Sequence, residues 1–336
     1  MATGVAAIRA RLRALANPKI AAHSKRFFKT GPGEYGEGDR FLGIRVPMLR
    51  KLVREHRETP EPVVFLLLQS PLHEERLLAL LMMVDRFERE TAAGQKRIYD
   101  HYIGHIKKYV NNWDLVDSSA REIVGAHLEN RDRRSLYKLA RSKSLWERRV
   151  AVIATYRFIK QRSFEDALAI SARLLTDDED LIHKAVGWML REIGNRNRAV
   201  AEQFLREHCR HMPRTMLRYA IEKFPEATRR KYLAGANERR RSRRALQQRG
   251  DQERVLLAGY HGRDSRENLV ERYLRGYTGY PERKPAVKRK HRNVAAPPLA
   301  ALQQCAQRTP RAVVAAISNA WSCATLSPFR AWIVDP

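Results

Sequence analysis

Four side chains combine one carboxylate, one guanidinium and two indoles at helical spacings. Trp113 and Asp117 are four residues apart and therefore share one face of a helix. Arg149 follows Trp113 by one repeat of similar helices, and Trp188 lies one turn after Lys184 in the repeat after that. A carboxylate and indole faces stabilise a cation, and a guanidinium binds phosphate. We expect the set to line one groove that acts on a polyanion carrying a transient positive centre.

The elements that position these residues are expected to be helices. Apolar residues recur at i, i+3, i+4 spacing in residues 77–87, 118–128, 148–160 and 183–193, and no convincing period-two strand is found. When the helices are aligned, steps of about 36 residues separate Arg76, Trp113, Arg149 and Lys184. This spacing predicts an all-α fold, an α-α superhelix of HEAT-like repeats. Pseudo-periodicity of evenly sized helices remains the alternative.

The charge balance indicates a polyanionic partner. The 336 residues contain 65 Lys and Arg against 37 Asp and Glu, a net charge of +28. Such a surplus attracts nucleic acid or an anionic membrane. The longest apolar run, residues 77–84, is far shorter than the roughly twenty residues of a membrane span. No secretory segment is found, so we expect a cytoplasmic, nucleoid-associated protein without membrane partners.

Composition divides the chain near residue 235. Residues 1–235 carry the helical pattern and form the expected repeat domain. Residues 236–336 contain basic clusters and few large apolar residues, so we predict a basic, largely unstructured extension. This extension is either a non-specific DNA anchor or an appendage without a selected role.

Two further sequence features have simple structural interpretations. Gly31, Gly33 and Gly36 match the dinucleotide-binding pattern G-x-G-x-x-G, but no strand precedes them, and we interpret the segment as a linker loop. The candidate carboxylate also has an alternative role, because Asp114 and Asp117 follow Asn112 and are placed to balance a helix dipole. Tryptophans at helical spacing are also common in protein cores.

Several separated stretches of the sequence favour the functional interpretation over these alternatives. They are GDRFLGIRVPMLRKL (39–53), NNWDLVDSSAREIVG (111–125), SLWERRVAVIATYRFIK (144–160), IHKAVGWMLREIG (182–194) and MPRTMLRYAIEKFP (212–225). Together they resemble the AlkD-type DNA alkylation repair proteins, HEAT-like-repeat glycosylases that remove N3- and N7-alkylated purines. The resemblance spans roughly residues 6–235.

The resemblance implies a role for each matched residue. The catalytic aspartate falls on Asp117, and its two tryptophan partners fall on Trp113 and Trp188. The phosphate-contacting arginine falls on Arg149. Four more positions are assigned to the DNA surface: Arg148, Lys184, Arg45 and Phe27. The last two depart from the family pattern, which has glutamine at the position of Arg45 and tyrosine at that of Phe27, and these departures leave the substrate range open.

The implied reaction is hydrolysis of the N-glycosidic bond of a cationic purine in duplex DNA. Such a base leaves as a neutral molecule without a general acid, and one carboxylate then suffices to stabilise the oxocarbenium-like sugar. We therefore expect a monomeric DNA glycosylase that needs no metal or cofactor. The main alternative is a non-catalytic binder of damaged or branched DNA on the same fold, and an α-solenoid protein scaffold is a third.

Overall fold

The fold is known from a computed structural model that describes residues 4–235. The predicted extension, residues 236–336, lies outside the described residues. The helices are α1 (Val5–Ala14), α2 (Pro18–Phe27), α3 (Val46–Glu55), α4 (Glu61–Leu68), α5 (His73–Arg89), α6 (Ala92–Tyr109), α7 (Trp113–Asp117), the π-helix η1 (Arg121–Gly125), α8 (Arg134–Leu139), α9 (Leu145–Ala154), α10 (Tyr156–Lys160), α11 (Glu165–Arg173), α12 (Asp180–Arg196), α13 (Arg198–His208) and α14 (Arg214–Ala220).

Within residues 4–235 there is no strand, only an isolated bridge between Arg40 and Leu72. None of the helices in this range is long and apolar enough to span a bilayer. The prediction of an all-α helical repeat is confirmed.

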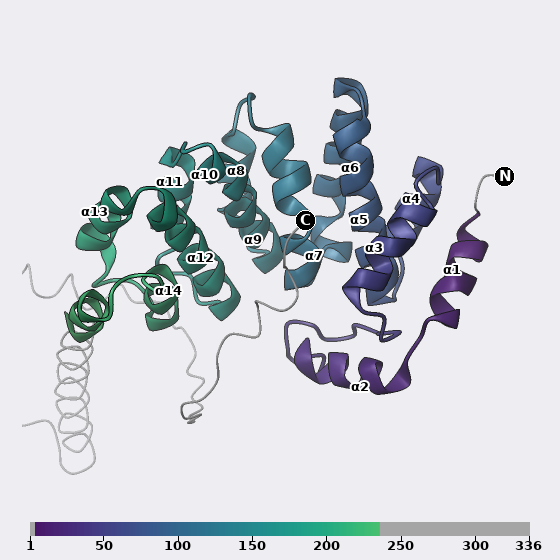
Figure 1. The fold of residues 1–336 in the computed structure, drawn as a ribbon, viewed down its shortest axis with the longest axis horizontal. Helices are drawn as coiled ribbons and strands as arrows, with labels where there is room; N and C mark the ends of the chain where they lie inside the picture. Colours follow the sequence, from purple (N-terminus) through teal and green to yellow (C-terminus); the bar gives the residue numbers. More distant parts are fainter. Residues whose placement is uncertain (1–3, 236–336) are drawn as a thin grey trace, which may run out of the picture. The chain divides into compact units, whose positions relative to one another are not determined.

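Alternate helices form a continuous inner row. α5, the α7–η1 segment, the α9–α10 segment, α12 and α14 contact one another in chain order. Outer helices pack against this row, as α4 does on α5, α8 on α9, and α11 and α13 on α12. Figure 1 shows these pairs succeeding one another along the chain. Each pair buries its apolar face against its neighbours, which is why the helices need the stack to be stable.

Two glycines allow the inner helices to approach closely. A Cβ atom at Gly125 would lie 2.5 Å from the Ala154 carbonyl oxygen, and one at Gly187 would lie 2.5 Å from the Met216 carbonyl oxygen. Because real Cβ atoms do not approach this closely, a larger residue would push η1 from α9 or α12 from α14.

The predicted helix over residues 118–128 differs in one detail. A π-helical turn at Arg121–Gly125 follows α7 instead of a continuous α-helix. Ser119 donates a side-chain hydrogen bond to the Leu115 carbonyl, and Gly125 packs on Ala154 just beyond it. Apolar spacing over eleven residues does not distinguish a π turn from an α turn.

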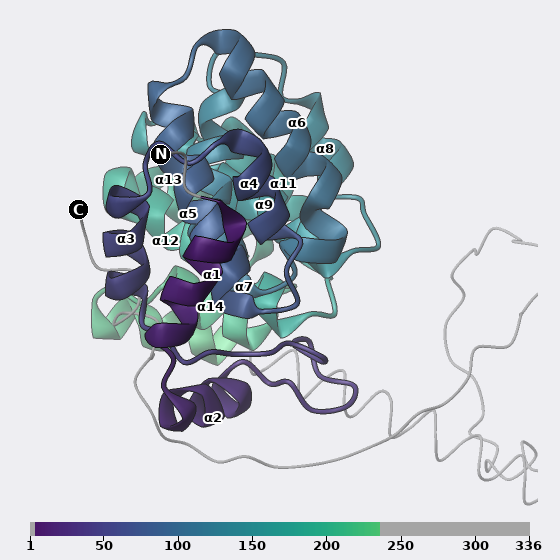
Figure 2. The ribbon, with the colours of Figure 1, turned by 90° about the vertical axis from the view of Figure 1, so that its right-hand side faces the viewer.

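The N-terminal ends of the inner helices carry the residues aligned in the sequence. Arg76, Trp113, Arg149 and Lys184 each lie within the first five residues of their helices. α2 and the segment that connects it to α3 lie at the lower edge of the helices in both ribbon views (Figures 1 and 2). The candidate site is therefore formed where helix starts meet this connecting segment.

Candidate functional site

Asp117 and Arg149 form a bidentate ion pair in the protein interior. Arg149 Nε lies 2.9 Å from Asp117 Oδ1, and Arg149 Nη2 lies 2.7 Å from Asp117 Oδ2. Arg149 Nη1 donates a third bond to the carbonyl of Leu181, at the start of α12. The arginine side chain is 1% exposed and the aspartate side chain 0%. The pair thus joins α7, α9 and α12, with both carboxylate oxygens engaged.

Burial and the guanidinium act on Asp117 in opposite directions. Burial raises the pKa of the Asp117 carboxyl, and the charge and hydrogen bonds of Arg149 oppose that rise. Arginine is not deprotonated in proteins, and a fork of two N–H donors matches an ionised carboxylate. The arrangement therefore keeps one carboxylate and its counter-charge buried, away from water.

Trp113 lies beside this pair under a cluster of aromatic rings. It is 3% exposed, and its ring stacks on Phe28 at a centroid distance of 5.3 Å. Phe27 meets it edge-on at 5.9 Å. Burial raises the pKa of the Tyr35 hydroxyl, in the segment between α2 and α3, to about 12, and the neighbouring Trp113 opposes that rise. Trp113 is therefore a packed residue that lies beside that segment.

Trp188 belongs to a second cluster further along the inner row. Its indole Nε1 donates to Glu192 Oε1 at 3.3 Å, and its ring lies 6.0 Å from that of Tyr156. The guanidinium groups of Arg121 and Arg196 lie 5.2 and 5.5 Å from the Tyr156 ring centroid. Trp188 is half-buried. No contact joins it to Asp117 among the described residues.

The expectation of one open groove is thus wrong for part of the set. Asp117 and Arg149 lie together, but both are buried. Each charge is neutralised by the other, so the pair is stable without contact with water. Trp113 shares α7 with Asp117 but is covered by aromatic rings, and Trp188 lies in the separate Tyr156 cluster. The alternative interpretation of the tryptophans as packing residues holds for Trp113 in this structure.

The other residues assigned to the DNA surface differ in accessibility. Arg148 binds the carbonyls of Ser142 and Lys143 at 3.0 Å and pairs with Asp177 at 2.6 Å, so its charge is already satisfied. Lys184 pairs with Asp180 at 2.8 Å. Phe27 packs on Trp113, as described above. Arg45 is exposed at the start of α3. No finding tests a DNA-binding role for these residues.

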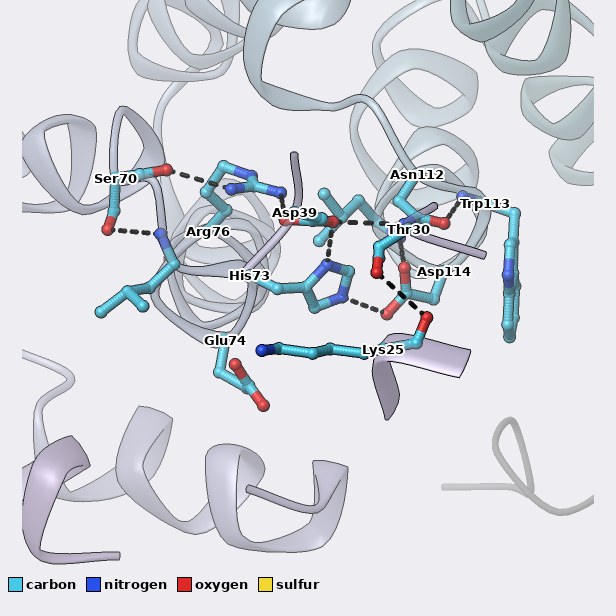
Figure 3. Close-up of polar contacts among 12 residues, drawn as sticks. Lys25, Thr30, Asp39, Ser70, His73, Glu74, Arg76, Asn112, Trp113 and Asp114 are labelled. Carbon is cyan, nitrogen blue, oxygen red and sulfur yellow. Dashed lines mark hydrogen bonds and ion pairs between the residues drawn. The ribbon is translucent and has the colours of Figure 1, made fainter. Parts of the chain in front are cut away.

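A buried polar network beside Trp113 was missed by the sequence analysis (Figure 3). His73 lies at its centre, with Nδ1 2.8 Å from Asp39 Oδ2 and Nε2 2.7 Å from Asp114 Oδ2. Arg76 Nη2 donates to Asp39 Oδ1 at 2.6 Å, and Asn112 Nδ2 donates to Asp39 Oδ2 at 3.2 Å. The network links the segment before α3 to the starts of α5 and α7.

His73 is held as a cation by two carboxylates. Burial lowers the pKa of its imidazole, but the charge and hydrogen bonds of Asp114 and Asp39 outweigh burial and raise it to about 9. For Asp39, burial raises the pKa of the carboxyl, but His73 and Arg76 outweigh it and lower that pKa to about 2. The signal in the sequence was four consecutive charged or polar residues, 73–76, at a helix start that the periodicity places in the core.

Glu74 and Glu75 complete this helix start. Glu74 accepts backbone hydrogen bonds from Leu42, Gly43 and Ile44 at 2.7–3.2 Å. Glu75 pairs with Arg9 of α1 at 2.9 Å. Carboxylates near a helix N-terminus are favourable to the helix dipole. The first turn of α5 therefore fixes both α1 and the segment before α3.

In chemical terms, the site offers a protected carboxylate–guanidinium pair next to an indole, within a strongly basic chain. Its one negative charge is buried and neutralised by the guanidinium of Arg149. Within residues 4–235 no three His, Cys, Asp or Glu side chains are grouped as metal ligands would be.

Comparison with known proteins bears on the fold and the family of the chain. A predicted DNA alkylation repair enzyme from Enterococcus faecalis has a similar fold, with a TM-score of 0.50 and 18% identity over 63% of this chain and 97% of its own. AlkD2 from Streptococcus mutans aligns with a TM-score of 0.40 and 15% identity over 62% of this chain and 98% of its own. No curated protein matches the sequence. The family model described as DNA alkylation repair enzyme matches residues 8–224, which is more than half of the chain. The chain therefore belongs to the DNA alkylation repair enzyme family.

Proposed function

We propose that the protein is a DNA glycosylase that hydrolyses the N-glycosidic bond of N3- or N7-alkylated purines in duplex DNA. The observation that carries the proposal is the ion pair of Asp117, at the end of α7, with Arg149 of α9, one helical turn from Trp113. The net charge of +28 supports a DNA substrate.

The proposed chemistry needs one carboxylate and no general acid. The alkylated purine is already cationic, so it leaves as a neutral base while positive charge develops on the sugar. Asp117 supplies the opposing negative charge and orients the attacking water. Trp113 and Trp188 are assigned to the cationic sugar through cation–π contacts. They lie in separate aromatic clusters in the free protein, so DNA binding must uncover Trp113 and bring both rings to the sugar. No metal or cofactor takes part.

Arg149 acquires a double role in this proposal. Its guanidinium covers both oxygens of Asp117 in the free protein, so at least one of these bonds must open before the carboxylate faces a sugar. A phosphate oxygen that approaches Arg149 competes for the same donors and thereby releases the carboxylate. Substrate binding and exposure of the acid are then one event.

The burial of Asp117 favours a second candidate function. A side chain that is 0% exposed and fully paired is also what a purely structural carboxylate looks like. The protein would then bind damaged or branched DNA on the same basic helical repeat without removing a base. The two functions differ in a single product, the free base.

The deciding experiment measures release of 7-methylguanine from duplex DNA by the full chain. Release by the wild type that falls by about a hundredfold or more in Asp117→Asn supports the glycosylase, in line with the loss of a transition-state contact. Asp177→Asn is the matched control, because Asp177 also pairs with an arginine of α9 but lies outside the proposed chemistry. Absence of release by the wild type, or undiminished release by a folded Asp117→Asn, rejects the proposal. Structure-selective binding without release supports the binder.

We also propose that the protein acts as a monomer, on chromosomal DNA in the cytoplasm. Sedimentation of the protein with and without a duplex measures the number of copies bound.

A further inference from the structure

The inner row of helices begins one helix earlier than α5. α3 packs on α5, and α1 packs on the outer helix α4, so these two helices continue the inner and outer helices toward the N-terminus. α3 and α14 lie toward opposite ends of the row in Figure 1. Five steps of about 8–10 Å between packed helices give the row a length of about 40–50 Å. Duplex DNA rises about 3.4 Å per base pair, so this length corresponds to about 12–15 base pairs.

A cation stands at the same position in most of these inner helices. The fifth helical residue is Arg50 in α3, Arg149 in α9, Lys184 in α12 and Arg218 in α14. In α5 the cation is the fourth residue, Arg76. Because stacked repeats place equivalent helices side by side, equal positions lie along one edge of the row. The inner row therefore carries a line of cations near the starts of its helices.

Burial along this line of cations changes from the middle of the row to its ends. Arg149, in the middle, is 1% exposed and binds Asp117 of α7 and the Leu181 carbonyl of α12, on either side of it. Arg50 and Arg218, at the two ends, are exposed and form no ion pair or side-chain hydrogen bond within residues 4–235. A helix at the end of the row has an inner neighbour on one side, so its cation is not enclosed as Arg149 is.

The charges at both ends of the row favour an anionic partner. Residues 45–54 contain four Lys or Arg and no Asp or Glu, and residues 210–223 contain four Lys or Arg and one acid. The carboxylates nearest in the sequence are already paired, since Glu55 lies 3.8 Å from Lys51 and Glu222 pairs with Arg191 of α12. Exposed cations in such surroundings attract a phosphate backbone.

Both end helices are fixed to elements that carry the candidate site. The segment that leads into α3 contains Asp39, which accepts a hydrogen bond from Asn112, the residue before Trp113. At the other end, α14 approaches α12 closely at Gly187, the residue before Trp188. The exposed arginines of α3 and α14 are therefore held at defined positions on either side of the site.

We propose that Arg50 and Arg218 bind phosphates of the two duplex arms on either side of the lesion, so that about 12–15 base pairs lie along the inner row. Arg149 acts at the lesion itself, and the two exposed arginines hold the flanking duplex. Duplex DNA as the partner rests on the proposed function. The test below measures binding separately from base release, so the two proposals fail separately.

The test compares Arg50→Gln and Arg218→Gln with wild type in the full chain, by fluorescence anisotropy at several salt concentrations. The duplex contains one 2′-fluoro-7-methyldeoxyguanosine, whose glycosidic bond resists hydrolysis, so binding is measured without reaction. Its arms have about ten base pairs each, and in two further duplexes one arm is cut to about three, too short to reach the end helix. Thermal melting checks that these surface variants are folded.

Lys160→Gln is the matched control, because it also removes one exposed positive charge. Lys160 forms no ion pair within residues 4–235. It is the last residue of α10, so it lies at the opposite edge of the inner row from the helix starts. A general effect of net charge would weaken binding by all three variants equally.

We expect each arginine variant to bind the full duplex about five- to tenfold more weakly at about 0.1 M salt, and Lys160→Gln to bind as wild type does. The slope of log affinity against log salt should become shallower by about 0.9 in each arginine variant, as for one lost phosphate contact. Shortening one arm should abolish the effect of Arg50→Gln, and shortening the other arm should abolish that of Arg218→Gln.

Two results overturn the inference. One is binding within twofold of wild type, with an unchanged salt slope, by either arginine variant. The other is a penalty that stays the same whichever arm is shortened, which would place the contact outside the arms. Absence of base release by a wild type that shows the expected arm dependence rejects the glycosylase proposal alone.

Discussion

The interior ion pair of Asp117 and Arg149 predicts a large stability loss when only one partner is removed. Arg149→Met keeps the volume of the side chain but leaves the carboxylate without its counter-charge. The arginine side chain is 1% exposed and the aspartate 0%, with bonds at 2.7 and 2.9 Å, so solvent screens the pair little. Leaving one buried charge unpaired costs about 3–5 kcal/mol. The melting temperature should fall by about 6–20 °C at about 2–4 °C per kcal/mol.

The double variant Asp117→Leu, Arg149→Met removes both charges and should recover most of this loss, to within about 2 kcal/mol of wild type. Arg157→Met is the matched control. Arg157 forms the same bidentate contact with Glu129 at 2.9 and 3.1 Å, but its side chain is 36% exposed. Its removal should cost less than about 1 kcal/mol. Urea titrations monitored by circular dichroism measure all four free energies of unfolding.

One outcome would refute the reasoning. Suppose that Arg149→Met is as stable as Arg157→Met but binds DNA much more weakly. The Arg149 guanidinium would then contribute to DNA binding, and its bond to Asp117 would contribute little to stability. The same stability measurements are also a control for the activity test, because an Asp117 variant that is unfolded would lose base release for reasons unrelated to the reaction.

Three further predictions concern the surroundings of this pair. His73 should stabilise the fold fully below about pH 6.5 and lose that contribution as pH rises through about 9, so urea titrations at pH 6, 8 and 10 should show a decline that His73→Gln lacks. Trp188→Ala should lower 7-methylguanine release at least tenfold in single-turnover assays and change the melting temperature little, because the side chain is half-buried; a large stability loss with normal release would reject its role. Gly187→Ala should destabilise by about 1–3 kcal/mol in urea titrations, since its Cβ would lie 2.5 Å from the Met216 carbonyl oxygen; an unchanged midpoint would show that α14 moves freely.

The inner helices could be predicted because their signal is local. Apolar spacing at α5, α9 and α12 reflects burial of one face, and the equivalent positions Arg76, Trp113, Arg149 and Lys184 do fall near the starts of successive inner helices. The sharing of a helical turn by Trp113 and Asp117 follows from their spacing alone.

The loop at residues 31–39 could not be placed in the same way. Its glycines indicate a turn, but nothing in their spacing states what the turn packs against. The contacts of Asp39 with His73 and of Tyr35 with Trp146 join residues more than thirty positions apart. Such pairs form only after the helices have stacked.

The sequence alone determined the helical repeat, the basic charge and the sharing of one helix face by Trp113 and Asp117, because periodicity and composition are properties of neighbouring residues. Tertiary structure decided that Arg149 points inward. A lone arginine is expected in water, and it is stable in the core only when a carboxylate from another helix and a backbone carbonyl meet it there. Asp117 and Leu181 supply these partners from α7 and α12. The distance between side chains on successive helices depends on how closely the helices pack, which no spacing along the chain records.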